Sequence, residues 1–247
     1  MDKKAETLRK NKALAALFLA LGIFAVALIV MRVVFYRFEY DPKYYPIDYG
    51  RFNFFSYFTV QSNLYVCFYL ICLGLAYLGK KKAEMIVMNP MVRLTVTTYI
   101  LVTGAVYCSG IPMGMTPPLY WNEFHPVLLS IVQIVHHMIM PPLMLVLFFA
   151  LQKSERIQAK KLPLVGIYPL VYSVFSIARG AVSDPQFYPY PFYRPEFFWQ
   201  IFCKNREMTL PAAYLLMLPI LIAGIGVFVL LAFVLSVIYN RMYDKNK

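Results

Sequence analysis

The sequence predicts an all-α integral membrane protein, a bundle of six transmembrane helices with both termini in the cytoplasm. Hydrophobic residues make up 60% of its 247 residues and 15% are charged, against about 25% in soluble domains. The charged residues stand between apolar runs of roughly twenty residues, the length that crosses a bilayer. No run alternates apolar and polar residues as a membrane β-strand does, so we expect every span to be a helix.

Six apolar segments define the expected spans, all within one membrane domain that covers residues 1–247. The first follows five cationic residues, as a signal peptide would. It continues to Tyr36 without a small-residue cleavage site, so we expect it to remain as a span. The longest polar connection, 183–208, is too short for a separate domain. The six segments are 13–36, 54–79, 91–111, 126–151, 162–182 and 209–240.

The cationic residues fix the expected orientation. With the N-terminus in the cytoplasm, sixteen Lys and Arg residues lie inside and six outside, while Arg32 and Arg179 lie near the outer ends of spans. This asymmetry follows the positive-inside rule. The net charge of +12 is then mostly a matter of topology, helped by attraction of the inner face to anionic membrane lipids, and we expect no nucleic-acid partner.

We expect neither a cofactor nor a metal site. Cys67 and Cys72 lie five residues apart in an apolar segment, without a His or a second Cys pair at zinc-ligand spacing. No Asp or Glu lies in the core of a span. This argues against a carboxylate metal cage, a carboxylate-backed catalytic triad and a proton-coupled transporter.

The predicted outer loops, 38–49, 117–124 and 187–202, are rich in Tyr, Phe, Trp and Pro. One interpretation is an aromatic belt at the membrane interface. The other is a rigid lid, stiffened by proline, over a cavity that opens outward.

Polar residues of the second and fourth spans fall on single helical faces. The stripe in the second span comprises Ser56, Thr59, Ser62, Asn63 and Cys67, at three- and four-residue steps. In the fourth span Ser130, Gln133 and His137 share one side, and His136 points about 100° away. Because Gln133 precedes His137 by four residues, we expect its side-chain amide to hydrogen-bond the imidazole and fix its tautomer.

The third and fifth spans add two more polar faces, so that four helices imply one shared interior. The face of the third span carries Thr95, Tyr99, Thr103 and Tyr107, and that of the fifth carries Tyr168, Tyr172, Ser176 and Arg179. Arg179 either snorkels to the interface or faces the interior as a clamp for an anion or a carbonyl group.

Such an interior suits catalysis. A hydroxyl nucleophile needs an adjacent base, and a neutral histidine can take its proton. Thr59 and His137 are the plausible pair, and Asn63, Gln133 or Arg179 could stabilise an oxyanion.

Two other interpretations stay open. The same interior could belong to a non-catalytic carrier or receptor that binds an amphipathic small molecule, with Tyr168, Tyr172, Arg179 and His136 among the binding residues. Alternatively, the polar seams only hold helices together, and a histidine joins two of them by a hydrogen bond.

Four strings, in this order and spacing, resemble the Pr-six-Pr family of bacterial membrane proteins. They are FSYFTVQSN at 55–63, His137 with Pro141, YPLVY at 168–172 followed by Arg179 and Gly180, and YPYPF at 188–192. That family is similar to the eukaryotic androgen-induced and ADTRP-like proteins. The resemblance covers most of the chain from about residue 30 onward.

The resemblance implies a multi-pass hydrolase of lipid acyl esters in a bacterial plasma membrane. The eukaryotic members cleave fatty acid esters of hydroxy fatty acids with a membrane-embedded threonine and histidine, which would here be Thr59 and His137. The predicted boundaries place Thr59 about five residues and His137 about eleven residues from the outer ends of their spans. At roughly 1.5 Å per residue, their depths would differ by about 9 Å.

Overall fold

The computed structural model describes residues 8, 10–35, 51–112, 126–183, 186–203 and 207–245, and this part of the chain is helical without a strand. It contains six helices long and apolar enough to cross a membrane. The all-α fold and the six spans are therefore confirmed, with boundaries within five residues of those predicted. The spans are Lys12–Val34, Phe58–Tyr77, Pro90–Gly110, Val127–Ala150, Ala159–Val182 and Leu210–Lys245.

The described residues group into two compact units. The first extends to Ala159 and includes the end of the chain from Val234, and the second covers Lys160–Phe233. The last helix, α9 (Leu210–Lys245), contributes to both units. The expectation of one membrane domain stays a prediction.

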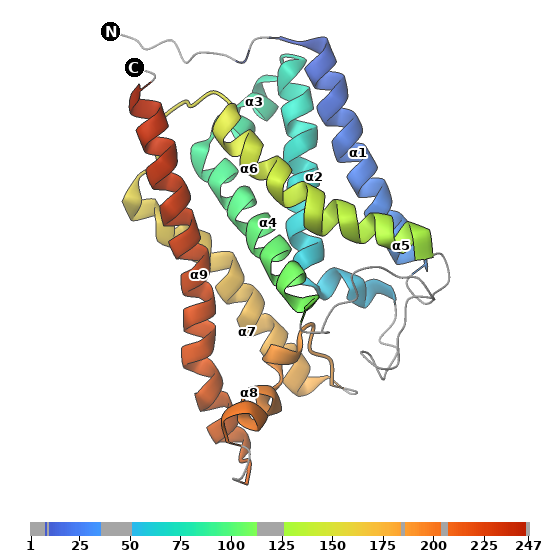
Figure 1. The fold of residues 1–247 in the computed structure, drawn as a ribbon, viewed down its shortest axis with the longest axis vertical. Coiled ribbons are helices and arrows are strands. Elements are labelled where there is room, and N and C mark those ends of the chain that lie inside the picture. Colours follow the sequence, from blue (N-terminus) through green and yellow to red (C-terminus); the bar gives the residue numbers. More distant parts are fainter. Residues whose placement is uncertain are drawn as a thin grey trace. The chain divides into compact units, whose positions relative to one another are not determined.

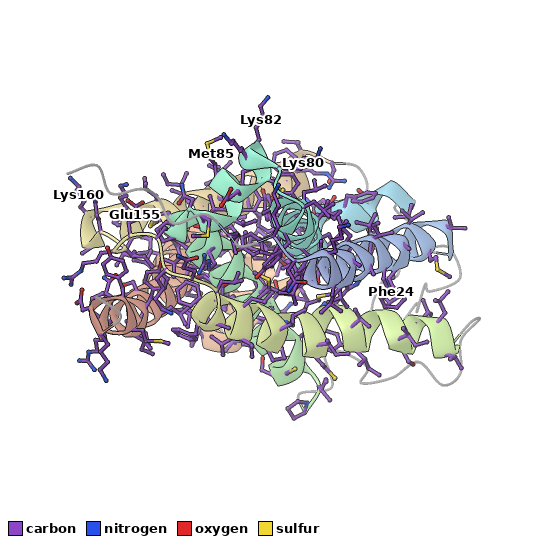
Figure 2. The ribbon with its side chains drawn as sticks, turned by 90° about the horizontal axis from the view of Figure 1, so that it is seen from above. Phe24, Lys80, Lys82, Met85, Glu155 and Lys160 are labelled. Carbon is purple, nitrogen blue, oxygen red and sulfur yellow. The ribbon has the colours of Figure 1, made fainter. Side chains whose placement is uncertain are left out.

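Four helices of the first unit pack in chain order (Figure 1). They are α1 (Lys12–Phe35), α2 (Phe58–Tyr77), α4 (Pro90–Gly110) and α6 (Met140–Ala150), and each contacts the next. Small residues let α1 and α2 approach closely, since a Cβ atom on Gly74 would lie 2.9 Å from the Ala15 carbonyl oxygen. On the opposite side of α1, Phe24 is 48% exposed and projects from the ribbon (Figure 2), as expected of a lipid-facing residue.

Shorter elements begin and connect these helices. The 3₁₀ helix η2 (Arg51–Ser56) leads into α2, and α3 (Lys81–Met88) joins α2 to α4. The turn between α2 and α3 contains Gly79 at φ 86°, a conformation that favours glycine. At the start of α4 the Asn89 side chain accepts hydrogen bonds from the main-chain N–H groups of Met91 and Val92, which caps the helix.

A fully buried arginine at the start of α4 joins this helix to the end of α3 and the end of α6. Arg93 donates hydrogen bonds to the carbonyl oxygens of Val87, Leu151 and Gln152, at 3.1–3.2 Å. The Tyr69 hydroxyl donates to the same Val87 oxygen. Arg93 thus satisfies carbonyl groups at the ends of α3 and α6 that have no partner within their own helices.

The fourth span is not one regular helix, which corrects a sequence-based expectation. It consists of α5 (Pro126–Gln133), the π-helical segment η3 (Ile134–Ile139) and α6, and the chain changes direction along it (Figure 1). The cause lies in Pro141 and Pro142, which have no N–H group to donate to the carbonyl groups of His137 and Met138 four residues earlier. Such π-helical turns occur frequently at functional sites.

The second unit contains η4 (Ala159–Gly166), α7 (Ile167–Val182), η5 (Pro191–Tyr193), α8 (Pro195–Phe202) and α9 up to Phe233. Within it, α9 packs closely on η4, where a Cβ atom on Gly166 would lie 3.1 Å from Ile225. The segment after α7 folds back onto that helix, and Tyr188 rests directly on Gly180.

Candidate functional site

The ring of His137 is oriented by two neighbours. Its Nδ1 atom lies 3.3 Å from the main-chain carbonyl oxygen of Gln133, and its plane stacks on Tyr107 of α4 with centroids 4.0 Å apart. A carbonyl oxygen only accepts hydrogen bonds, so Nδ1 carries the proton. In a neutral ring, Nε2 then holds the available lone pair, which is the form that a general base requires.

This arrangement corrects the expected role of the Gln133 side chain. The group that fixes the His137 tautomer is the main-chain carbonyl of Gln133, and the side-chain amide does not bond the ring. Substitution of Gln133 by leucine should therefore leave the His137 tautomer unchanged. His136 and His137 have different neighbours, the Ala25 carbonyl oxygen of α1 and the Tyr107 ring of α4, so the two side chains point in different directions.

The main chain at Thr59 is held by two side chains of its own helix. The Ser62 hydroxyl and the Asn63 amide donate to the Thr59 carbonyl oxygen at 3.0 Å and 2.8 Å. Because that oxygen only accepts, Nδ2 of Asn63 must face it. Oδ1 of Asn63 is left buried without a hydrogen-bond partner within the described part of the chain. Asn63 therefore offers a ligand an acceptor as well as its second N–H group.

A hydroxyl pair fixes the register of α2 against α4. Oγ of Ser62 and Oγ1 of Thr103 lie 2.7 Å apart in a buried position. Since the Ser62 proton is directed to the Thr59 carbonyl oxygen, Thr103 is the donor in this pair. The predicted polar face of the third span is thus confirmed for Thr103, which meets α2, and for Tyr107, which meets His137.

That register brings Thr59 and His137 to similar depths. Thr59 lies three residues before Ser62 and Tyr107 lies four residues after Thr103, on antiparallel helices (Figure 1). These steps correspond to about 4.5 Å and about 6 Å in the same direction. With His137 stacked on Tyr107, the predicted gap of about 9 Å is largely removed. The reason is the bend between α5 and α6, because an inclined α5 gains less depth per residue.

Similar depth does not amount to a bonded pair. The contacts of the His137 ring are with Gln133 and Tyr107, and no hydrogen bond joins it to Thr59. Thr59 is half-buried at the start of α2. Its role as a nucleophile and that of His137 as a base stay predictions.

His136 has a different environment. Its Nε2 atom lies 3.3 Å from the carbonyl oxygen of Ala25 in α1, and the side chain is 4% exposed. The hydrogen bond joins η3 to α1, the structural role considered from the sequence.

One residue of this region, Arg32 in the last turn of α1, was not among the predicted site residues. Its guanidinium lies 5.7 Å from the centre of the Phe54 ring. The signal that could have identified it is a cation near the outer end of a span, where the positive-inside rule disfavours one.

Tyr172 and Arg179 lie in the second unit, where an aromatic segment covers α7. The Tyr193 ring meets Tyr172 edge to face at 6.0 Å, and its hydroxyl lies 2.9 Å from that of Ser173. Arg179 lies 4.7 Å from the Phe187 ring centre, in a cation–π contact. Burial raises the pKa of the Tyr193 hydroxyl, which keeps it protonated. A cavity that Tyr172 and Arg179 share with Thr59 stays a prediction.

These contacts bear on the two interpretations of the aromatic loops. Phe187, Tyr188 and Tyr193 are buried, so they pack on their own unit instead of facing lipid as a belt would. They cover α7, as a lid would. The predicted loops 38–49 and 117–124 lie outside the described residues.

The fold and these contacts define a polytopic α-helical membrane protein. No family model, no curated protein and no solved structure matches the chain. Within the described ranges, no three His, Cys, Asp or Glu side chains are close enough together to hold a metal ion.

Proposed function

We propose that this protein is a membrane-embedded hydrolase of a lipid acyl ester, with Thr59 as nucleophile and His137 as general base. The observation that carries the proposal is the contact between Nδ1 of His137 and the Gln133 carbonyl oxygen, which leaves Nε2 able to accept a proton. The similar depth of Thr59 and the resemblance to the Pr-six-Pr family support the same assignment.

In this mechanism Nε2 of His137 takes the Thr59 hydroxyl proton as Oγ1 attacks the ester carbonyl carbon. The alcohol leaves with that proton, and water then releases the fatty acid from the threonyl ester by the same route. The second N–H group of Asn63 and the charge of Arg32 are available to stabilise the oxyanion.

We place the protein in a bacterial plasma membrane with both termini in the cytoplasm. The support is the resemblance and the excess of cationic residues in the predicted inner loops. The bound substrate is then an amphipathic lipid that enters from the membrane or from its outer surface.

A carrier or receptor for an amphipathic molecule is the second candidate. It is favoured by the buried Oδ1 atom of Asn63, which has no hydrogen-bond partner in the described part of the chain and which a ligand with a hydroxyl group would satisfy. In this case the residues bind a ligand without forming a covalent intermediate.

A fluorophosphonate probe, which phosphonylates activated serine and threonine hydroxyls, distinguishes the two. The purified protein should be labelled, and peptide mapping should place the adduct on Thr59. Thr59→Val, which keeps the shape and removes the hydroxyl, should abolish labelling, and so should His137→Ala. Thr59→Ser should keep it.

The matched control is Thr97→Val, because Thr97 is a buried threonine within a span but belongs to α4, whereas Thr59 belongs to α2. This variant should be labelled as wild type. An adduct that persists in Thr59→Val would move the nucleophile elsewhere. A wild-type protein that resists every acyl and phosphonate probe while binding an amphipathic ligand would establish the carrier.

A further inference from the structure

Two sets of cationic side chains stand out at the lysine-rich end of the first unit. One set has partners within the protein. Arg93 donates to three carbonyl groups, Lys153 donates to the Phe149 carbonyl oxygen at 2.9 Å, and Arg156 pairs with Asp244 at 3.4 Å.

The other set surrounds the turn between α2 and α3. Its members are exposed and, among the residues that the structure describes, have no hydrogen-bond or ion-pair partner; they are Lys10, Lys12, Lys80, Lys81 and Lys82. We call them the α2–α3 lysine cluster. The fold brings its two segments together, because the Lys10 side chain lies over Gly79, where a Cβ atom would be 2.6 Å from Lys10 Cε. The main-chain N–H of Asn11 also donates to the Tyr77 carbonyl oxygen.

The nearest acidic residue that the structure describes does not neutralise this cluster. Glu84 follows the three lysines on α3, but its Oε1 atom accepts a hydrogen bond of 2.6 Å from the main-chain N–H of Leu8. The carboxylate therefore anchors the N-terminal segment beside the cluster and makes no ion pair with it. The uncompensated positive charge calls for an anion from outside the protein.

Apolar side chains stand next to the charges. Leu78 is 43% exposed and Met85 is 68% exposed. Figure 2 shows Lys82 and Met85 projecting from α3, away from the helices of the first unit. Leu78 directly follows the second span, and Met85 lies in the short helix between the second and third spans. Phospholipid headgroups meet acyl chains where spans end.

We propose that the α2–α3 lysine cluster binds the headgroup of an anionic phospholipid, whose acyl chains lie along Leu78 and Met85. The lysines supply charge to the phosphate, and the exposed apolar side chains make the surface fit a lipid better than a free phosphate ion. This site is separate from Thr59 and His137 and does not depend on their chemistry.

The test titrates dioleoylphosphatidylglycerol into the full-length protein in neutral detergent and counts bound lipids by native mass spectrometry. Dioleoylphosphatidylcholine has the same chains without net charge and serves as the comparison. Each lysine near an anionic surface contributes roughly fivefold to affinity, so Lys81→Gln/Lys82→Gln should lose roughly 25-fold for phosphatidylglycerol. Lys81→Arg/Lys82→Arg should keep it.

The matched control is Lys160→Gln/Lys161→Gln, which removes the same charge from another predicted inner loop and should leave the affinity unchanged. An equal loss in the control would show a general effect of positive charge and would overturn the proposal. So would equal binding of the two lipids by wild type. Competition by glycerol phosphate as effective as by the lipid would assign the site to a free phosphate and overturn it as well.

Discussion

At the scale of single residues, Arg93 shows how a charge inside a membrane protein can serve packing. It is fully buried and is bonded to three main-chain oxygens from two segments. The positive-inside rule counts it with the inner lysines, but its position makes it a connector and not a surface charge. Its loss would remove a donor from each of three carbonyl groups, and only the Val87 oxygen would keep the Tyr69 hydroxyl shown above; the loss of such bonds is costly in a buried place.

Arg93→Met should therefore destabilise the protein by about 2–4 kcal/mol, because buried carbonyl oxygens lose the donors that Arg93 supplies. Thermal unfolding in detergent, followed by the monodisperse fraction after heating, measures the effect. Arg156→Met removes an arginine whose ion pair with Asp244 is exposed and should change stability by less than about 1 kcal/mol. Equal melting of both variants would show that Arg93 contributes little.

The two histidines should respond differently to substitution. His136→Ala removes the hydrogen bond to Ala25 and should cost about 1 kcal/mol of stability, with probe labelling retained. His137→Ala should lose labelling and leave the fold intact, because the ring is half-buried and its bond is to its own helix. Melting curves and labelling rates of the two variants show which histidine acts as the base. The reverse pattern would assign the base to His136.

At the scale of elements, the contact between α4 and η3 carries the site. A Cβ atom on Gly104 would lie 2.6 Å from Pro141 Cγ and 3.0 Å from the His137 carbonyl oxygen. A proline ring and a main-chain oxygen have little freedom to move, so Gly104→Ala should push η3 away from α4. A shift of about 1 Å at a catalytic group costs on the order of 100-fold in rate.

The probe-labelling rate of Gly104→Ala measures this loss. Gly224→Ala is the control, since a Cβ atom there has no neighbour within 4 Å, and it should label at the wild-type rate. Wild-type labelling of Gly104→Ala would mean that the position of η3 on α4 does not govern the reactivity of Thr59.

The elements also show where sequence reasoning succeeds. Hydropathy and charge locate all six spans, because a segment that crosses lipid must be long, apolar and helical. The faces of α2 and α4 follow from regular helical periodicity, which places Thr103 opposite Ser62. Regular α-helical periodicity does not predict η3, where the span becomes π-helical just before Pro141 and Pro142.

At the scale of the whole molecule, topology determines the side from which a substrate reaches Thr59. Within the first unit, the start of α1, the α2–α3 turn and the end of α9 lie at the same end (Figure 1). Hydrogen bonds at that end join Asn11 to Tyr77 and Asn240 to Ile157. The lysine-rich segments are thus gathered on one side of this unit, which the positive-inside rule assigns to the cytoplasm.

Single cysteines at Lys81, Lys160 and Tyr190 test this assignment. The background has Cys108 and Cys203 changed to serine, because both are accessible, and keeps Cys67 and Cys72, because both are buried. In intact cells, a membrane-impermeant maleimide should label Tyr190→Cys alone. Lys81→Cys and Lys160→Cys should react only after the membrane is opened, since they follow an even number of spans from a cytoplasmic N-terminus. Labelling of Lys81→Cys in intact cells would invert the orientation, place the start of α2 at the cytoplasmic face, and require that a substrate reach Thr59 from inside the cell.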